Sequence, residues 1–479
     1  MRRPIHAPAN DLGLHEDVLT PMHHHQPGKD FLLAHDDDGV RPVTVDQAVE
    51  LARARRSPGV DEVDQLPDGP RGIRRRSLLA AGSVGLGAML MPSAGPRLSF
   101  AATPGNRDLL VVVFLRGGFD GLSAVVPVAD PAYYAARPGI GVRPEHTFAL
   151  DSRFGMNQNL APLKPLWDAR QLAVVVGAGN PGVTRSHFDD QVSCELAAPA
   201  NQRTGWIARH LALASAELGT FRAISIGGQV ALSLTTTAFD TLAMSGVKEF
   251  DLYSWGALRP RMMGSLSALY ANSGGFEVEQ SRLLMSAIDR LGALREQTYV
   301  PAGGAVYEAN RFATGLRDIA QLAKAEIGLE AVTIDSQDWD MHRGLGRADV
   351  ATDWFARQAT ELSRALAAFA TDLGPRWNST TVVLISEFGR RVTQNGDLGV
   401  DHGHGNTLWL LGGGINGGVF GSQPALAAAN LQQGAVPITT DYRTVLAEVI
   451  SKRLGNTRTG EVFPGWSSTA TPLGVARAR

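Results

Sequence analysis

The chain has 479 residues, of which 44% are hydrophobic and 19% are charged, and its formal net charge is −2 at pH 7. This is the composition of a globular protein with one large core or two smaller ones. The near-neutral balance excludes a strongly basic protein that binds nucleic acid or an anionic membrane through charge alone. Cys194 is the only cysteine, so there is no internal disulfide and stability has to come from the core.

Residues 1–73 are polar and irregular and contain six of the twelve histidines, among them His23-His24-His25. A histidine run can bind metal adventitiously. The low hydrophobicity of the whole segment favours a disordered leader, and this is the organisation that we predict.

Residues 74–101 have the form of a twin-arginine export signal. Arg75-Arg76 is followed by two leucines and by the small, apolar stretch Ala80–Met91. This stretch is shorter than the roughly 20 apolar residues of a membrane span. The segment ending at Ala101 has the small-x-small form of a cleavage site, so the mature chain is expected to begin near Ala102. The alternative is a buried helix with a basic start. We predict export by the twin-arginine translocase to the periplasm, the cell envelope or the medium.

From residue 102 onward, short apolar runs alternate with longer helical patterns, which predicts an α/β domain with a mainly parallel sheet flanked by helices. The expected strands are Leu109–Leu115, Leu172–Val176, Phe221–Ile226, Ala331–Ile334, Thr381–Ile385 and Thr407–Leu411. The expected helices are Asn159–Ala169, Trp206–Ala216, Glu277–Glu296, Glu308–Ile327, Thr352–Leu373 and Tyr442–Leu454. Residues from about 231 to 308 are expected to form a mostly helical insertion.

The first expected strand runs into Arg116, two glycines and then Asp120. In sheets of this kind, ligands bind beyond the carboxyl ends of the strands. Asp120 is therefore a candidate metal ligand, and a turn-forming aspartate is the equally weighted alternative.

The second expected strand leads to Arg185-Ser186-His187-Phe188-Asp189. Ser186 and Asp189 have the spacing of a capping box, which predicts that a helix begins here. The same position suits a nucleophilic hydroxyl, because a helix N-terminus stabilises a developing anion. Arg185 is placed to hold an anionic group beside it.

Two later strands are followed by acids and histidines. Three carboxylates and an imidazole lie within eight residues, which favours a metal site over a solvated acidic loop: Asp335, Asp338, Asp340 and His342. Further on, an Asp-His-x-His motif is typical of divalent-cation ligands: Asp401, His402 and His404. Of the six histidines past residue 100, four lie in these clusters, with His187 as the fourth.

In this order, the motifs resemble the domain-of-unknown-function family 1501, exported proteins grouped beside the sulfatases in the alkaline phosphatase superfamily. The similarity covers residues 108 to 465. The matching pieces are Leu115-Arg116-Gly117-Gly118-x-Asp120-Gly121-Leu122, Arg185-Ser186-His187-Phe188-Asp189, Trp339-Asp340-x-His342, Ser386-Glu387-Phe388-Gly389-Arg390, Asp401-His402-Gly403-His404-Gly405 and Thr440-Asp441-Tyr442-Arg443.

The resemblance implies an alkaline phosphatase-like fold in which Asp120 and Glu387 are metal ligands and Ser186 is the nucleophile. It also implies that the metal set is completed by an Asp-x-x-x-His pair and a last histidine: Asp338 with His342, and His402 or His404. Asp335 and Asp340 compete with Asp338 for this role. Phe388 stands where a histidine ligand is usual, so a second metal site needs Asp401 or another donor, or is absent.

Our leading hypothesis is an exported, metal-dependent hydrolase of phosphate or sulfate esters, acting on a small molecule or a polymer. One or two divalent cations (Zn, Ca, Mg or Mn) would activate Ser186, and Arg185 or Arg116 would stabilise the ester oxygens. The alternative is a non-catalytic, metal-stabilised envelope or binding protein on the same fold, because a fold does not determine an activity.

Overall fold

The computed structural model describes residues 31–36, 39–44, 108–214, 221–236, 238–239, 241–250, 264, 288, 291–467 and 469–479. The chain divides into two compact units, Met1–Arg74 and Arg75–Arg479. In the first unit, β1 (Phe31–Asp36) and β2 (Gly39–Thr44) form an antiparallel pair within the expected leader. The rest of the leader and the predicted export signal at residues 74–101 lie outside the described residues.

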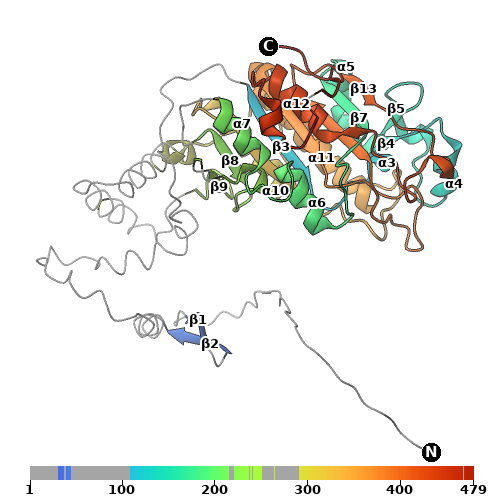
Figure 1. The fold of residues 1–479 in the computed structure, drawn as a ribbon. Coiled ribbons are helices and arrows are strands. Elements are labelled where there is room, and N and C mark those ends of the chain that lie inside the picture. The colour runs from blue at the N-terminus through green and yellow to red at the C-terminus, as the bar shows by residue number, and fades with distance from the viewer. Residues whose placement is uncertain are drawn as a thin grey trace, which may run out of the picture. The chain divides into compact units, whose positions relative to one another are not determined.

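The second unit is built around one large, mainly parallel sheet, drawn in Figure 1. Its strands are β3 (Leu109–Leu115), β7 (Leu172–Gly179), β8 (Ala223–Ile226), β9 (Leu242–Met244), β10 (Ala331–Ser336), β11 (Thr380–Ile385), β12 (Asn406–Leu411), β13 (Gly418–Gly421) and β14 (Thr440–Asp441). Their order is β13-β7-β12-β11-β3-β10-β8-β9, and β14 also pairs with β7. Within this sheet, only the pairings of β12 with β11 and with β7 are antiparallel. The predicted α/β class is confirmed.

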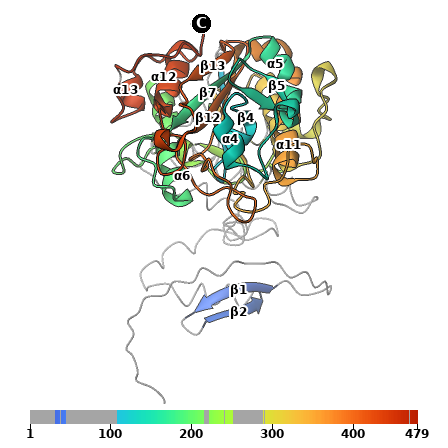
Figure 2. The same ribbon diagram turned by 90° about the vertical axis from the view of Figure 1, so that its right-hand side faces the viewer.

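Helices cover both faces of the sheet, which explains why β3 is apolar and buried at every residue. Val111 and Val113 enter one core with α10 (Arg311–Lys324) and α11 (Trp354–Leu373). Leu110 and Val112 enter the other core with α6 (His187–Leu196), α7 (Trp206–Ala214) and α12 (Tyr442–Lys452). Figure 2 shows α6 and α12 on one side of the sheet and α11 on the other.

The expected elements correspond closely to the observed ones, with instructive differences. The helix expected at Asn159–Ala169 is a 3-10 segment, η2 (Gln158–Leu163), followed by α5 (Lys164–Asp168), because Pro162 interrupts it. In the range 231–308, the described residues include the edge strand β9, and most of the expected helix Glu277–Glu296 lies outside the described residues.

Smaller elements pack around this framework. A three-stranded antiparallel sheet consists of β4 (Val125–Val126), β6 (Gly155–Asn157) and β5 (Thr147–Ala149). The remaining short helices are α3 (Gly121–Ala124), α4 (Pro131–Ala136), α13 (Thr459–Val462), η1 (Pro144–His146), η3 (Leu232–Leu234), η5 (Ala302–Gly304), η6 (Gly374–Ser379) and η7 (Ala428–Asn430). Within the part of the chain that the structure describes, no helix is both long and apolar enough to cross a membrane.

Candidate metal centre

The polar loops meet at one edge of the sheet because of the strand directions. β3, β10 and β11 are parallel and end together, with Ser336 beside Leu115 and Ile385 beside Phe114. β12 runs antiparallel to β11, so its start lies at this edge and the loop before it, 401–405, arrives there too. The same edge therefore receives segments that are far apart in the sequence, as expected for the carboxyl ends of parallel strands.

Two glycines after β3 allow these loops to approach each other closely. Gly117 and Gly118 both have positive φ values, 111° and 63°, which favour glycine. A Cβ atom on Gly117 would lie 2.5 Å from the backbone nitrogen of Asp340, and one on Gly118 would lie 2.5 Å from a ring carbon of Phe388. A side chain at either position would push the loops of the site apart.

Three histidines surround one oxygen of Asp340. The distances from its Oδ1 atom to the Nε2 atoms are 3.2 Å for His342, 3.4 Å for His187 and 3.6 Å for His402. Donor atoms of Asp340, His187 and His402 all lie within 4.8 Å of one another. His187 is the first residue of α6, His342 follows β10, and His402 precedes β12. The Asp340 side chain is 48% exposed, so this cluster opens to solvent.

In each of the three rings, the Nδ1 atom forms a hydrogen bond with an oxygen atom. Nδ1 of His187 lies 2.7 Å from Oε1 of Glu387, and Nδ1 of His342 lies 3.2 Å from Oδ1 of Asp401. Nδ1 of His402 lies 2.8 Å from the backbone carbonyl oxygen of Arg185. A carbonyl or an ionised carboxylate can only accept, so each Nδ1 carries the hydrogen. In the neutral rings, the lone pair of each Nε2 atom then faces Asp340.

This arrangement fits a divalent cation. The Nε2 atoms of His342 and His402 are 2.9 Å apart, and two lone pairs at this distance need a proton or a cation between them. Nη1 of Arg390 also approaches Nε2 of His342, at 3.5 Å. Nε2 of His187 is buried without a hydrogen-bond partner. Three imidazole nitrogens and a carboxylate, with second partners on the imidazoles, are the ligand set of zinc-type sites. The hydrogen bond to Glu387 raises the pKa of His187, whereas burial lowers the pKa of His402.

Glu387 is a support for His187 rather than a neighbour of Asp340. Its side chain is fully buried, and Oε1 also accepts from the backbone nitrogen of Gly117 at 2.9 Å and from Nε2 of Gln191 at 3.0 Å. Burial opposes its ionisation, but hydrogen bonds from His187 and Gln191 lower its pKa to about 2. The neighbouring Phe388 ring packs 4.8 Å from the ring of His187, centroid to centroid.

Arg390 places a buried positive charge beside the cluster. Its Nη2 atom lies 2.6 Å from Oδ1 of Asp340, and its other nitrogens donate to the carbonyl oxygens of Gly118 at 2.6 Å and Val400 at 2.9 Å. Burial raises the pKa of Asp340, but the ion pair with Arg390 outweighs it and holds that pKa below its usual range. The guanidinium thereby ties together the loops that follow β3, β10 and β11.

The structure brings together part of the ligand set expected from sequence. Asp340, His342 and His402 meet in the cluster, while Asp401 and Glu387 lie behind the histidines.

Four other candidate ligands have different surroundings. Both oxygens of Asp120 contact the buried Arg137 instead of the histidines, at 2.5 and 3.0 Å. Asp335 pairs with Arg116, Asp338 is exposed, and His404 is buried with no hydrogen bond at its Nδ1 atom.

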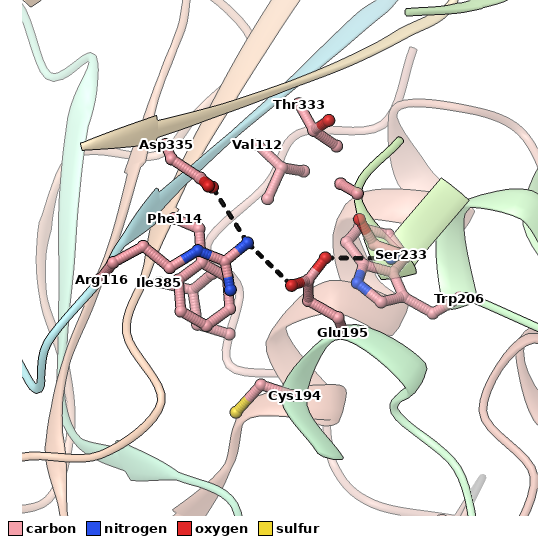
Figure 3. A pocket seen from close by; sticks show the side chains of 11 residues that line it. Val112, Phe114, Arg116, Cys194, Glu195, Trp206, Ser233, Thr333, Asp335 and Ile385 are labelled. Carbon is pink, nitrogen blue, oxygen red and sulfur yellow. Dashed lines mark hydrogen bonds and ion pairs between the residues drawn. The ribbon is translucent and has the colours of Figure 1, made fainter. Parts of the chain in front are cut away.

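The two candidate anion-binding arginines differ in their availability. Arg116 is paired with Glu195 at 2.8 Å and with Asp335 at 3.0 Å, and it lies over the Phe114 ring, as Figure 3 shows. Its charge is thus already neutralised. Among the described residues, no hydrogen bond or ion pair involves the guanidinium of Arg185, whose own backbone nitrogen donates to Asp190 at 2.6 Å.

Ser186 is the N-cap of α6, as its spacing from Asp189 predicts. Its hydroxyl oxygen accepts a hydrogen bond from the backbone nitrogen of Asp189 at 3.4 Å. Its neighbours in sequence both take part in the site, because the carbonyl oxygen of Arg185 contacts His402 and the side chain of His187 faces Asp340.

Sequence reasoning did not assign roles to His187, Gln191 and Arg390. The signal for His187 was present, since it follows a predicted N-cap at a strand end and belongs to the clustered histidines. Gln191 and Arg390 act through contacts with loops far away in the sequence, and no local pattern reveals such contacts.

The protein-family model described as "Protein of unknown function (DUF1501)" matches residues 295–460. The match confirms the family resemblance over the segment that carries Asp340, His342, Glu387, Asp401 and His402. No curated protein was found to match the sequence.

Solved structures with similar folds include members of the alkaline phosphatase superfamily. One is a protein of that superfamily from Vibrio parahaemolyticus, with 11% identity, 77% of this chain and 78% of that chain covered, and a TM-score of 0.32. Another is the PsFucS1 sulfatase from Pseudoalteromonas sp., with 12% identity, 85% and 78% covered, and a TM-score of 0.32. A third is the C-terminal periplasmic domain of EcEptC from Escherichia coli, in complex with Zn, with 10% identity, 66% and 76% covered, and a TM-score of 0.28. These scores are too low to transfer a site or an activity, and the α/β class stands on the strand order given above.

Proposed function

We propose that this protein is a metal-dependent hydrolase of phosphate or sulfate esters that acts outside the cytoplasm. The observation that carries the proposal is the convergence of three imidazole Nε2 atoms on Oδ1 of Asp340. His187, His342, His402 and Asp340 would hold the cation. When bound, a divalent cation supplies Lewis-acid polarisation of an ester oxygen and neutralises charge that develops on it.

The chain itself provides a binding place for the anionic group of an ester. The backbone carbonyl of Arg185 contacts His402, and its guanidinium makes no hydrogen bond or ion pair among the described residues. A free guanidinium binds phosphate or sulfate oxygens in a bidentate manner. The first turn of α6 carries Asp189 and Asp190, and Asp190 accepts from the backbone nitrogens of Thr184 and Arg185, so the guanidinium rather than the helix N-terminus would hold the anion.

Ser186 is the proposed nucleophile. Its hydroxyl oxygen accepts a hydrogen bond from the backbone nitrogen of Asp189 at 3.4 Å. A serine hydroxyl has a pKa far above neutrality and needs activation before it attacks an ester. In the sequence it stands between Arg185, the proposed anion-binding residue, and His187, a proposed ligand of the cation.

A groove next to this site offers room for the alcohol part of the ester. It has a volume of about 480 Å³ and runs along the ends of β8 and β10 past Arg116, Gln191 and Asp335. Gln191 joins the groove to the cluster, because its Oε1 atom accepts from Arg116 at 3.3 Å and its Nε2 atom donates to Glu387. Through Glu387, Gln191 connects the groove with His187, one of the proposed ligands.

A non-catalytic, metal-stabilised binding protein is the second candidate. The observations that favour it are the engagement of Ser186 as a helix cap and the burial of Asp120 in its pair with Arg137. In such a protein, the cation would tie together the loops after β10, before β12 and at the start of α6, and no ester would be cleaved.

Hydrolysis assays separate the two candidates. The purified protein, loaded in turn with Zn²⁺, Mn²⁺, Mg²⁺ and Ca²⁺, is assayed against a panel of phosphate and sulfate esters. We expect turnover that depends on metal and is lost in His402→Ala, with His404→Gln as the matched control. Metal binding without turnover of any ester would favour the binding protein.

A further inference from the structure

We propose that this centre holds a single divalent cation of the zinc type, and that the guanidinium of Arg390 takes the place of a second cation. The proposal rests on the metal centre of the proposed function and specifies how many cations it holds and of which chemical class.

The donor atoms select the class of cation. His187, His342 and His402 present three imidazole nitrogens, and Asp340 adds one carboxylate. Imidazole suits Zn²⁺ and its transition-metal neighbours, whereas Ca²⁺ and Mg²⁺ prefer sites made of oxygen ligands. The Nδ1–H groups donate to oxygen atoms of Glu387, Asp401 and Arg185, so the histidine atoms that remain for a cation are the three Nε2 atoms.

The charges around the cluster select the number of cations. Among the groups in direct contact with the rings or with Asp340, there are three carboxylates, those of Asp340, Asp401 and Glu387, and one positive charge, that of Arg390. The remainder is two negative charges, which one divalent cation cancels. A second divalent cation would leave the cluster with two positive charges and would lie close to a guanidinium that is fully buried and held by three loops.

The carboxylate best placed to bind a second cation is already neutralised in the same way. Asp120 follows β3 at the edge where the cluster lies, but Arg137 binds both of its oxygens in a fully buried pair. Across the described ranges, the one group of three or more histidine, cysteine or acidic side chains with ligand atoms all close enough to hold a metal is His187, Asp340 and His402. His342 adjoins this group through its Nε2 atom, 2.9 Å from that of His402. Two buried arginines, Arg390 and Arg137, thus already neutralise carboxylates that a second cation would otherwise bind.

Metal titration of the full-length protein tests the proposal. His23, His24 and His25 are changed to Gln in the parent protein, since this run could bind metal adventitiously. The parent is stripped with a chelator and titrated with Zn²⁺ by calorimetry, and bound metal is counted by elemental analysis after desalting. We expect one equivalent of Zn²⁺, which an excess of about 100-fold of Ca²⁺ or Mg²⁺ does not displace. Two equivalents, or preferential binding of Ca²⁺, would overturn the proposal.

Single substitutions of the proposed ligands show whether the protein has one zinc site or two. His187→Ala, His342→Ala and His402→Ala should each lose the same single equivalent, whereas His404→Gln should keep it. In a two-cation centre, some of these variants would retain one equivalent. Arg390→Gln should gain a second, weaker equivalent of Zn²⁺, and Arg390→Lys should not. A folded Arg390→Gln variant without that gain would overturn the role of Arg390. If Arg390→Gln does not fold, the count in the parent still decides the number of cations.

These counts do not depend on turnover, so the two proposals fail separately. A protein that binds one Zn²⁺ and cleaves no ester disproves the hydrolase and leaves the single zinc-type centre intact.

Discussion

Glu387 accepts a hydrogen bond from Nδ1 of His187 at 2.7 Å, and both of its oxygens are occupied by donors from the surrounding loops. The family resemblance implies that this carboxylate is a metal ligand. In the structure its hydrogen bond fixes the tautomer and orientation of a histidine, and the histidine faces the cluster.

We therefore expect Glu387→Gln to weaken metal binding by about 10- to 100-fold without abolishing it, as is common for partners of ligating histidines. The measurement is the Kd for Zn²⁺ by calorimetry. Glu308→Gln, which changes an exposed carboxylate paired with Arg364, is the control and should bind like the parent. Complete loss of Zn²⁺ binding in Glu387→Gln would show that Glu387 is itself a ligand. An unchanged Kd would show that it has no role in the site.

Two substitutions at Ser186 distinguish its role as a helix cap from its proposed role as a nucleophile. Ser186→Ala should cost about 1 kcal/mol of stability, because the first turn of α6 loses its cap. Ser186→Asn keeps a capping side chain and should keep the stability. Neither variant retains the hydroxyl, so both should lose turnover while binding metal normally. Ester hydrolysis at parental rates in Ser186→Asn would show that the hydroxyl is not the nucleophile.

We expect the protein to lose stability in mild acid because of His210, which lies on α7, remote from the metal centre. Burial lowers its pKa from 6.5 to about 4, and it contacts the amide of Asn456 at 3.1 Å. The folded pKa lies below the unfolded one, so its contribution is complete above pH 6.5 and is lost as the pH falls toward 4. The shift corresponds to roughly 3 kcal/mol. Urea unfolding of the metal-free protein from pH 7.5 to 4 should show this decline, and His210→Gln should reduce it. Equal pH slopes in the two proteins would contradict the assignment.

The predicted export signal lies outside the described residues and is tested directly. Arg75→Lys together with Arg76→Lys conserves the charge but removes the arginine pair that the twin-arginine translocase recognises. We expect the full-length double variant to remain in the cytoplasm, whereas Arg55→Lys with Arg56→Lys, in the leader, should leave export unchanged. Cell fractionation measures both, and normal secretion of the Arg75 and Arg76 variant would refute the signal.

Much of the fold could be predicted from the sequence, because the central strands are continuous apolar runs. All six expected strands are present, and Leu109–Leu115 has the expected bounds. The antiparallel direction of β12 could not be predicted, since an apolar run has no direction. The short strands β9, β13 and β14 carry too few residues to show a period. Pro162 broke a helix whose apolar spacing looked continuous.

The candidate site could be predicted only in part. His342, His402 and Asp340 stand out because acids and histidines are dense in these loops. Which carboxylates reach the histidines depends on partners that local sequence does not reveal. Asp120 is taken by Arg137, 17 residues away, and Asp340 is held by Arg390, 50 residues away.

The most direct test of the central claim is a crystal structure of the Zn²⁺-loaded protein with anomalous diffraction recorded at the zinc edge. We predict one strong anomalous peak among the Nε2 atoms of His187, His342 and His402 and a carboxylate oxygen of Asp340, at distances of about 2.0–2.2 Å. The Nδ1 contacts to Glu387, Asp401 and the carbonyl of Arg185 should persist. A zinc-loaded crystal with no peak at this position, or with its peak at Asp120 or His404, would contradict the account.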